Sequence, residues 1–424
     1  MIDGALRGAI LLGAILGAQV PVLPPTLRVE TSKSAEAVRE LEAAIAKMPA
    51  SIEELQKEAF AGIPLTKADA VKAREILWAA QKARLAKERA AEIEARLITD
   101  GKLEMPFDLK TFGEKPERGR SLWISLHGGG GAPKEVNDSQ WENQKKLYKL
   151  EEGLYVSPRA PTNTWDLWHQ SHIDRMFDRL IEDLIAIEDV DPDRVYVLGY
   201  SAGGDGVYQI GPRMADRWAG AAMMAGHPND ASPLSLRNVA FALQAGANDG
   251  AYNRNKVAAE WGAELDRLAA ADPGGYPHYF KLHEGKGHWM DREDGAALPW
   301  MAKFRRDPVP VRVVWKQDDV THERSYWLAV PPGQAKPRSL VVVERKGQTI
   351  DVEKAEGIER LVIRLDDRMV DLDRPVRVTL RGRALFEARV ARTISTQIRS
   401  LLERKDPRLV FDAEVAVGLE LQPQ

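Results

Sequence analysis

The spacing of apolar positions changes twice along the chain, near residues 100 and 307. Over residues 24–99, apolar side chains recur at the spacing of a helix, among many Ala, Glu, Lys and Arg residues. Thr66 and Asp69 have the spacing of a capping box, which opens a helix. The apolar stripe is too interrupted for sustained heptads, so we expect a helical extension packed on the next domain and not a coiled-coil arm. The apolar face of its first helix is Val38, Leu41, Ile45 and Met48.

Residues 100–306 alternate short apolar runs with amphipathic helices. Repeated strand and helix units predict the α/β class, with a doubly wound and mainly parallel sheet covered on both faces. In such sheets, binding sites lie beyond the carboxyl ends of the strands. The runs expected to form strands are 122–126, 154–157, 195–198, 220–224, 239–245 and 279–282.

Residues 307–424 begin with a proline-marked linker and then show the alternation of strands. Lys346-Gly347 and Arg381-Gly382 are typical of tight hairpin turns. We therefore expect a small antiparallel β-sandwich, interrupted by a helix over about 393–403.

The 424 residues include 60 Lys and Arg against 63 Asp and Glu, for a net charge of −3. This balance argues against a nucleic-acid partner, because such a protein needs a surplus of basic side chains to neutralise phosphates. The absence of cysteine excludes disulfides, thiolate metal sites and a cysteine nucleophile. Covalent catalysis would have to use Ser, Thr, Lys or a carboxylate.

An apolar run over residues 8–23 follows Arg7 and is too short to span a membrane. It resembles the apolar region of a signal peptide, with small residues at 16–18 as a loose cleavage site. Asp3 weakens this interpretation, and the alternative is a buried N-terminal strand or helix. We expect residues 1–23 to direct export to the periplasm or the exterior.

The most specific pattern is Gly-Tyr-Ser-Ala-Gly at 199–203, directly after an apolar run and before a predicted helix. In this context Ser201 would occupy a strained strand-to-helix turn that exposes its hydroxyl, and the helix N-terminus would favour developing negative charge. Ser201 is therefore the predicted nucleophile.

A nucleophilic serine needs a base and an acid that orients the base. Asp249 follows the run 239–245, and His288 lies in the loop beyond the run 279–282, so both sit at predicted strand ends. Alternatives for the acid are Asp205 and Asp230. His283 competes with His288, but it falls inside or at the end of a strand.

The glycine-rich stretch after the strand at 122–126 is a candidate oxyanion hole, because consecutive glycines let backbone amides approach a substrate. A second donor would be the amide of Ala202. The loop residues expected to contribute are Gly128, Gly129 and Gly130.

Taken together, residues of about 120–300 resemble an α/β-hydrolase serine esterase, and the two glycine-containing motifs resemble those of bacterial polyhydroxybutyrate depolymerases and feruloyl esterases. The resemblance implies Ser201 as nucleophile, His288 as general base and Asp249 as orienting acid. It implies oxyanion donors at the 128–130 loop and at Ala202. Those secreted relatives are often cross-linked by disulfides, which this chain cannot form because it has no cysteine. The resemblance therefore supports the fold more than it supports membership of those subfamilies.

Aromatic residues follow two predicted strand ends and could line a substrate site. Trp165, Trp168 and His169 come after the strand at 154–157, where they would either form a wall for an acyl or aromatic group or simply cover the sheet edge. Trp289 follows the predicted base. Arg254 could bind a substrate carboxylate, and equally it could be a salt-bridged helix start.

These features predict hydrolysis of a carboxylic ester, from a small-molecule or polymeric substrate, through an acyl-enzyme. No cofactor, metal or nucleotide is indicated, because the histidines at 283 and 288 lack zinc-protease spacing and the glycine loop lacks a P-loop ending. Activity should rise with pH as the base, with an ordinary pKa of about 6.5, loses its proton. The alternatives are a peptidase of the prolyl-oligopeptidase type and a non-catalytic polymer-binding or surface protein.

Overall fold

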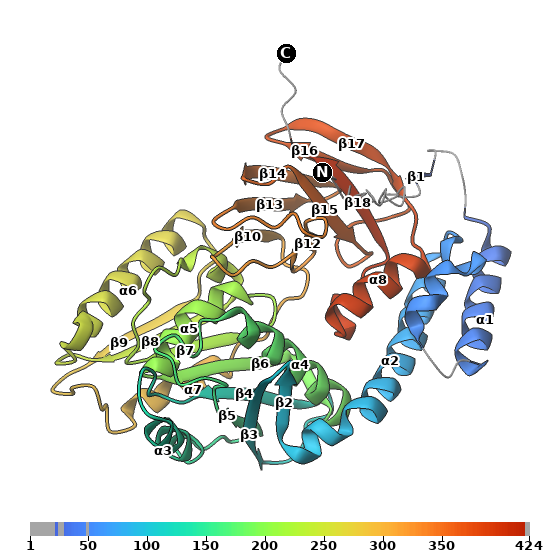
Figure 1. Ribbon diagram of the computed structural model, residues 1–424. Coiled ribbons are helices and arrows are strands. Elements are labelled where there is room, and N and C mark those ends of the chain that lie inside the picture. Colours follow the sequence, from blue (N-terminus) through green and yellow to red (C-terminus); the bar gives the residue numbers. More distant parts are fainter. Residues whose placement is uncertain (1–21, 24–28, 48–50, 420–424) are drawn as a thin grey trace, which may run out of the picture.

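The computed structural model describes residues 22–23, 29–47 and 51–419. Figure 1 shows three parts: N-terminal helices in blue, a central sheet flanked by helices, and β-sheets in orange and red. The predicted signal region falls almost entirely outside the described residues, so export stays a prediction. Within the described residues, no helix combines the length and apolarity needed to cross a bilayer.

Eight strands form the central sheet, in the order β2-β3-β5-β4-β6-β7-β8-β9. Only β3 runs antiparallel to its neighbours, and the other pairs are parallel. The predicted doubly wound, mainly parallel sheet is therefore confirmed. The strands are β2 (Leu97–Asp100), β3 (Leu103–Phe112), β4 (Arg120–Leu126), β5 (Gly153–Pro158), β6 (Val190–Tyr200), β7 (Gly220–Met224), β8 (Ala240–Gly246) and β9 (His278–His283).

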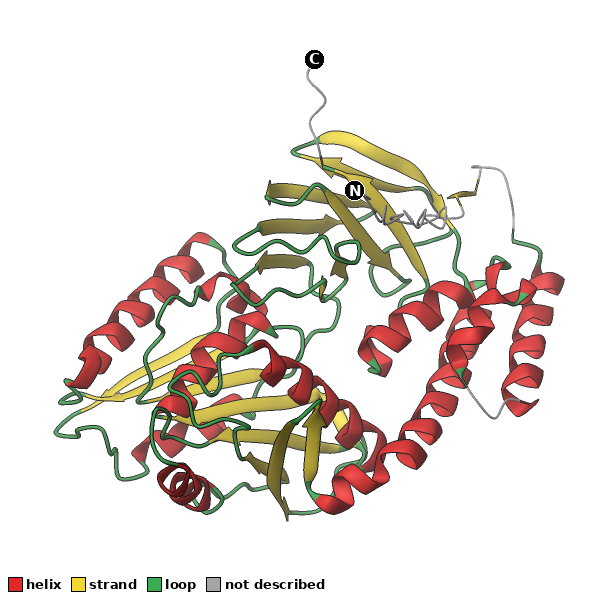
Figure 2. Ribbon diagram, viewed as in Figure 1, coloured by secondary structure: helices red, strands yellow, loops and turns green. Residues whose placement is uncertain are grey.

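Helices cover both faces of this sheet (Figure 2). Alternate side chains of a strand enter different cores: Val197 joins the core beneath α4, α5 and α6, whereas Tyr196 joins the core beneath α7. Parallel strands buried on both faces read as continuous apolar runs, which is why the sequence located them. The helices are α3 (Lys134–Gln144), α4 (Ser171–Ile187), α5 (Ala202–Arg213), α6 (Arg254–Ala271) and α7 (Ala297–Met301).

The C-terminal part contains a six-stranded sheet, β1-β17-β16-β14-β13-β10, and a four-stranded sheet, β11-β12-β15-β18. The predicted hairpin at Arg381-Gly382 is confirmed: Leu380 pairs with Arg383, and both turn residues have positive φ, 51° and 83°. The strands are β1 (Val22–Leu23), β10 (Arg312–Lys316), β11 (Arg324–Ser325), β12 (Leu328–Ala329), β13 (Leu340–Lys346), β14 (Thr349–Glu356), β15 (Arg360–Leu365), β16 (Val376–Leu380), β17 (Arg383–Val390) and β18 (Ala413–Gly418).

The N-terminal helices α1 (Thr31–Lys47) and α2 (Lys67–Ala95) pack in one apolar core with α8 (Ile394–Arg404) of the C-terminal part. The predicted cap at Thr66 is present, since its hydroxyl accepts the Asp69 N–H at 3.2 Å. α2 also runs along α4 of the central part. The predicted helical extension is thus confirmed, and it contacts both other parts.

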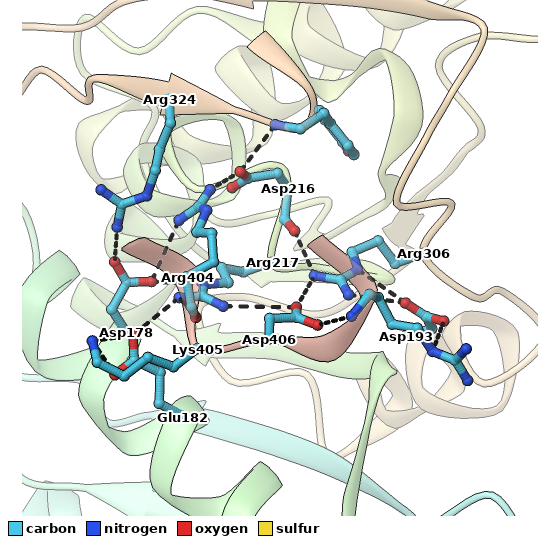
Figure 3. Close-up of polar contacts among 12 residues, drawn as sticks. Asp178, Glu182, Asp193, Asp216, Arg217, Arg306, Arg324, Arg404, Lys405 and Asp406 are labelled. Atoms are coloured by element: carbon cyan, nitrogen blue, oxygen red, sulfur yellow. Dashed lines mark hydrogen bonds and ion pairs between the residues drawn. The ribbon is translucent and has the colours of Figure 1, made fainter. Parts of the chain in front are cut away.

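The central and C-terminal parts meet at a cluster of charged side chains (Figure 3), here called the interface cluster. Arg306 binds Asp406 at 2.8 Å and Asp193 at 2.9 Å. Burial opposes ionisation of Asp406, but the charges of Arg306 and Arg217 outweigh it and lower the pKa of this carboxyl. The labelled members are Asp178, Glu182, Asp193, Asp216, Arg217, Arg306, Arg324, Arg404, Lys405 and Asp406.

The interface cluster predicts a large cost for removing one charge. Arg306→Met should lower the free energy of unfolding by about 3 to 5 kcal/mol, because it leaves buried carboxylates without their partner. Denaturant unfolding measures the change. Arg267→Met, which breaks the exposed pair with Glu264, is the matched control and should change little. Equal losses in the two variants would contradict the prediction.

Candidate functional site

Ser201 occupies the turn between β6 and α5, with φ 58° and ψ −122°. Such a turn needs space beside it, because a Cβ at Gly203 would lie 2.2 Å from the Leu126 carbonyl oxygen. The Ser201 N–H donates to the Met224 carbonyl at 2.9 Å, which ties the turn to the neighbouring strand. The backbone strain is therefore held by surrounding structure and presents the hydroxyl at the strand end.

The structure brings Ser201, Asp249 and His288 together from three loops. Nε2 of His288 lies 3.0 Å from Oγ of Ser201, and Nδ1 lies 2.8 Å from Oδ2 of Asp249. The Asp249 side chain is buried, whereas that of His288 is 43% exposed. With the proton on Nδ1 directed to the carboxylate, Nε2 is free to accept the serine proton.

The alternatives for the acid and the base lie elsewhere. Asp205 accepts the His227 N–H at 2.6 Å, and burial raises its pKa to about 6. Asp230 pairs with Arg338 of the C-terminal part. His283 is fully buried and bonds Gln244 at 2.8 Å, and no contact joins it to Ser201 among the described residues.

The loops that carry Asp249 and His288 touch directly. The Asn248 N–H donates to the Lys286 carbonyl at 2.8 Å, and the Ala247 N–H donates to the His283 carbonyl at 3.0 Å. At Gly246 the two loops are so close that a Cβ would lie 2.0 Å from the Gly287 carbonyl oxygen. A glycine at 246 is therefore a condition for Asp249 to reach His288.

The glycine-rich loop is fixed by His127. This imidazole contacts the Gly128 carbonyl through Nδ1 at 2.6 Å and accepts the Ala160 N–H through Nε2 at 3.1 Å. Burial lowers its pKa to about 4, which keeps the ring neutral with its proton on Nδ1. Since C=O and N–H of a trans peptide point in opposite directions, fixing the Gly128 carbonyl also fixes the direction of the Gly129 N–H.

One predicted oxyanion donor needs correction. The Gly130 N–H donates to Oδ1 of Asn137 at 2.8 Å, so this amide already has an acceptor. Among the described residues, no acceptor contacts the amides of Gly128, Gly129 or Ala202. These three amides remain the candidates for an oxyanion hole, and Asn137 serves to hold the loop.

The residues predicted to bind substrate divide into two groups. Trp165 and Trp289 are exposed, at 65% and 49%. Trp168 is fully buried, with its indole N–H donated to the His127 carbonyl at 3.0 Å, so its prediction as a substrate contact is wrong. It supports the glycine-rich loop from the core. His169 is partly buried with its ring against the edge of Trp165, and burial together with nearby Arg213 lowers its pKa to about 4.

Arg254 begins α6 and lies 4.8 Å above the ring of Tyr252. No ion pair within 4 Å joins it to a carboxylate among the described residues, but its charge acts on Asp205, where it opposes the rise in the pKa of that carboxyl. Tyr252, which is not among the residues predicted from the sequence, is 76% exposed and sits three residues after Asp249. The signal that could have identified Tyr252 is an aromatic residue in the loop that follows a predicted strand and contains the predicted acid.

The described residues contain no group of three or more His, Asp or Glu side chains arranged to hold a metal ion.

No protein-family model matches the chain, and no curated protein sequence matches it. Solved structures match about half of the chain, at low identity.

A thermostable esterase is 17% identical with a TM-score of 0.36, over 50% of this chain and 62% of that protein. The carboxylesterase from Mesorhizobium loti is 16% identical with a TM-score of 0.35, over 49% of this chain and 99% of its own. The feruloyl esterase module from Clostridium thermocellum is 16% identical with a TM-score of 0.34, over 49% of this chain and 84% of its own. The α/β-hydrolase fold of the central part rests on the strand order and on the turn at Ser201.

The close approach at Gly246 predicts that a side chain at this position weakens the contact between Asp249 and His288. In Gly246→Ala the new methyl group pushes the two loops apart, so covalent labelling of Ser201 by a fluorophosphonate should slow by about 100-fold. Gly250→Ala is the matched control, because its φ is −80° and nothing lies within 4 Å of its Cβ position. Unchanged labelling of Gly246→Ala would refute this account of the loop contact.

Proposed function

We propose that this protein is a serine hydrolase that cleaves carboxylic esters through an acyl-enzyme. The observation that carries the proposal is the hydrogen-bonded chain from Ser201 through His288 to buried Asp249, at the carboxyl ends of β6, β8 and β9. Three side chains distant in sequence meet in the order and geometry that nucleophilic catalysis requires.

In the first half of the reaction, Nε2 of His288 takes the proton of the Ser201 hydroxyl as its oxygen attacks the acyl carbon. The alcohol then leaves with that proton, and an ester forms between the acyl group and Ser201. In the second half, His288 takes a proton from a water molecule as the water oxygen attacks this ester. The bond to Ser201 then breaks, His288 returns the proton to the Ser201 oxygen, and the acid is released. Asp249 keeps the imidazole in the correct tautomer and stabilises it when it is charged.

The negative charge on the tetrahedral intermediate would be met by backbone amides. The amides of Gly129 and Ala202 are our preferred donors, because the former is directed by His127 and the latter opens α5, where the helix dipole favours negative charge. Gly128 lies beside the nucleophile, since its Cβ position is 3.1 Å from Cβ of Ser201.

The substrate would be held at an open rim. Trp165, Tyr252 and Trp289 belong to the loops after β5, β8 and β9, and each exposes about half or more of its surface. Such rings can stack on an aromatic or apolar part of an ester. We infer that a small-molecule or a polymeric ester could reach Ser201 from this side. Arg254, above Tyr252, is the cation available to a substrate carboxylate.

The first test is Ser201→Ala. We expect the wild type to hydrolyse p-nitrophenyl butyrate and the variant to lose at least about 10⁴-fold in kcat. Ser157→Ala is the control, because the Ser157 hydroxyl is buried and has no hydrogen-bond partner among the described residues. An intact rate in Ser201→Ala would refute the proposal.

The same assay separates the alternatives. Faster turnover of aminoacyl anilides than of esters would favour a peptidase, although the described residues before the central sheet form helices and one two-residue strand, and not a propeller. A wild type that neither cleaves esters nor reacts with a fluorophosphonate would favour a non-catalytic polymer-binding protein.

The rim predicts a substrate-dependent effect. Trp165→Ala should raise KM for an ester with an aromatic acyl group about 2- to 10-fold, from the loss of ring stacking, and leave an acetyl ester unchanged. Steady-state kinetics on the two substrates measure the difference. Val71→Ala, which trims an exposed apolar side chain on α2, is the control. An equal effect on both substrates would mean that Trp165 does not contact the acyl group.

A further inference from the structure

The loop that carries His288 contains no helix or strand between β9 and residue 293, yet its imidazole must be held within hydrogen-bonding distance of Ser201. One side chain from the central sheet reaches it. The Tyr200 hydroxyl donates to the His288 carbonyl at 2.5 Å and accepts the Met290 N–H at 3.1 Å. A single phenol oxygen thus binds the loop backbone on both sides of Trp289.

We propose that Tyr200, the residue before the nucleophile, is the positioning residue for the general base. Tyr200 is the last residue of β6 and Ser201 follows it in the turn, so the hydroxyl that attacks and the hydroxyl that anchors the base belong to consecutive residues. This inference rests on the proposed function. Tyr200 does not touch the reacting atoms and acts through the backbone of His288.

The surroundings of Tyr200 fit this role. Its side chain is 8% exposed in the core with Met290 and Tyr155, and the burial raises its pKa above the ordinary value, so it stays protonated and able to donate. Its ring also lies edge-on to His288 at 5.9 Å and near Trp289 at 5.7 Å. A Phe at this position would keep the ring contacts and remove only the two hydrogen bonds.

The acid side of the site has its own anchor, which makes the Tyr200 contact separable. His283 and Lys286, at the start of the same loop, are bonded through their carbonyls to Ala247 and Asn248. Those contacts hold the loop close to Asp249. They involve no residue of this loop beyond Lys286. In the segment 288–290, the Tyr200 hydroxyl therefore adds two backbone hydrogen bonds to the His288–Asp249 contact and the burial of Met290.

The test compares Tyr200→Phe with Tyr155→Phe. Tyr155 is a matched control, because its buried hydroxyl also makes two hydrogen bonds, to Ser125 and to the Gln144 carbonyl, in the same core but away from the base. We expect Tyr200→Phe to lower kcat for p-nitrophenyl butyrate and the rate of fluorophosphonate labelling together, by about 10- to 100-fold. KM should stay near the wild-type value, and Tyr155→Phe should keep full activity.

Two further readouts separate positioning from a structural role. Hydrogen exchange of the peptide containing Met290 should accelerate in Tyr200→Phe, while that of the peptide containing Ser201 should not. The factor lost in kcat should be the same at every pH on the plateau of the pH profile, since the hydroxyl sets position and not charge. If Tyr200→Phe does not fold, hydrogen exchange of the wild-type protein still tests the proposal. A Met290 amide that is not protected from exchange would overturn it.

The outcomes also separate this proposal from the proposed function. An active, labelled wild type with a Tyr200→Phe variant of equal activity overturns the positioning role alone. A wild type that neither turns over esters nor labels at Ser201 overturns the proposed function. Equal losses in Tyr200→Phe and Tyr155→Phe would assign the effect to general stability and also overturn the positioning role.

Discussion

The constraint on which the site depends is the sharp turn from β6 into α5. A residue with φ near 58° is strained, and here it persists because Gly203 lets the turn press against β4 and because the Ser201 N–H is bonded to β7. The turn has two consequences at once: it raises the hydroxyl above the sheet and leaves the Ala202 amide at the start of a helix, while Tyr200, just before the turn, contacts the loop that carries His288. Each depends on the same few backbone angles.

The topology of the sheet brings the other two residues of the site, Asp249 and His288, close together. Parallel strands end at one edge, so the loops after β8 and β9 are neighbours although their site residues, Asp249 and His288, are 39 positions apart. Adjacency alone would leave the two side chains loosely placed. The contact at Gly246 and the hydrogen bonds between the two loops fix the position of Asp249 relative to His288. The geometry of the site therefore depends on these backbone contacts as well as on the hydrogen bonds among Ser201, His288 and Asp249.

Much of this could be read from the sequence, for a physical reason. Strands buried on both faces appear as unbroken apolar runs, and a tight turn between strand and helix demands glycines, so the sheet and Ser201 were predictable. Features that depend on the path of a loop were not. Trp168 looks like its neighbour Trp165 in sequence, but the chain turns its ring into the core. Strands β2 and β3 were not predicted, because they mix polar and apolar residues. The contact between the Gly130 amide and Asn137 was not predicted either, because it depends on how α3 packs against the loop.

The interface cluster gives the C-terminal part a role that its strand pattern did not reveal. Buried ion pairs add little net stability compared with apolar packing, but they tolerate few alternative arrangements, so they favour one fixed orientation. A second set of contacts leads from the C-terminal part toward the site. His322 of the C-terminal part binds Asp174 at 2.7 Å, and Asp174 also accepts from Arg213. Arg213 in turn donates to the His169 carbonyl. A chain of polar contacts thus connects the loop that carries Trp165 with the C-terminal part.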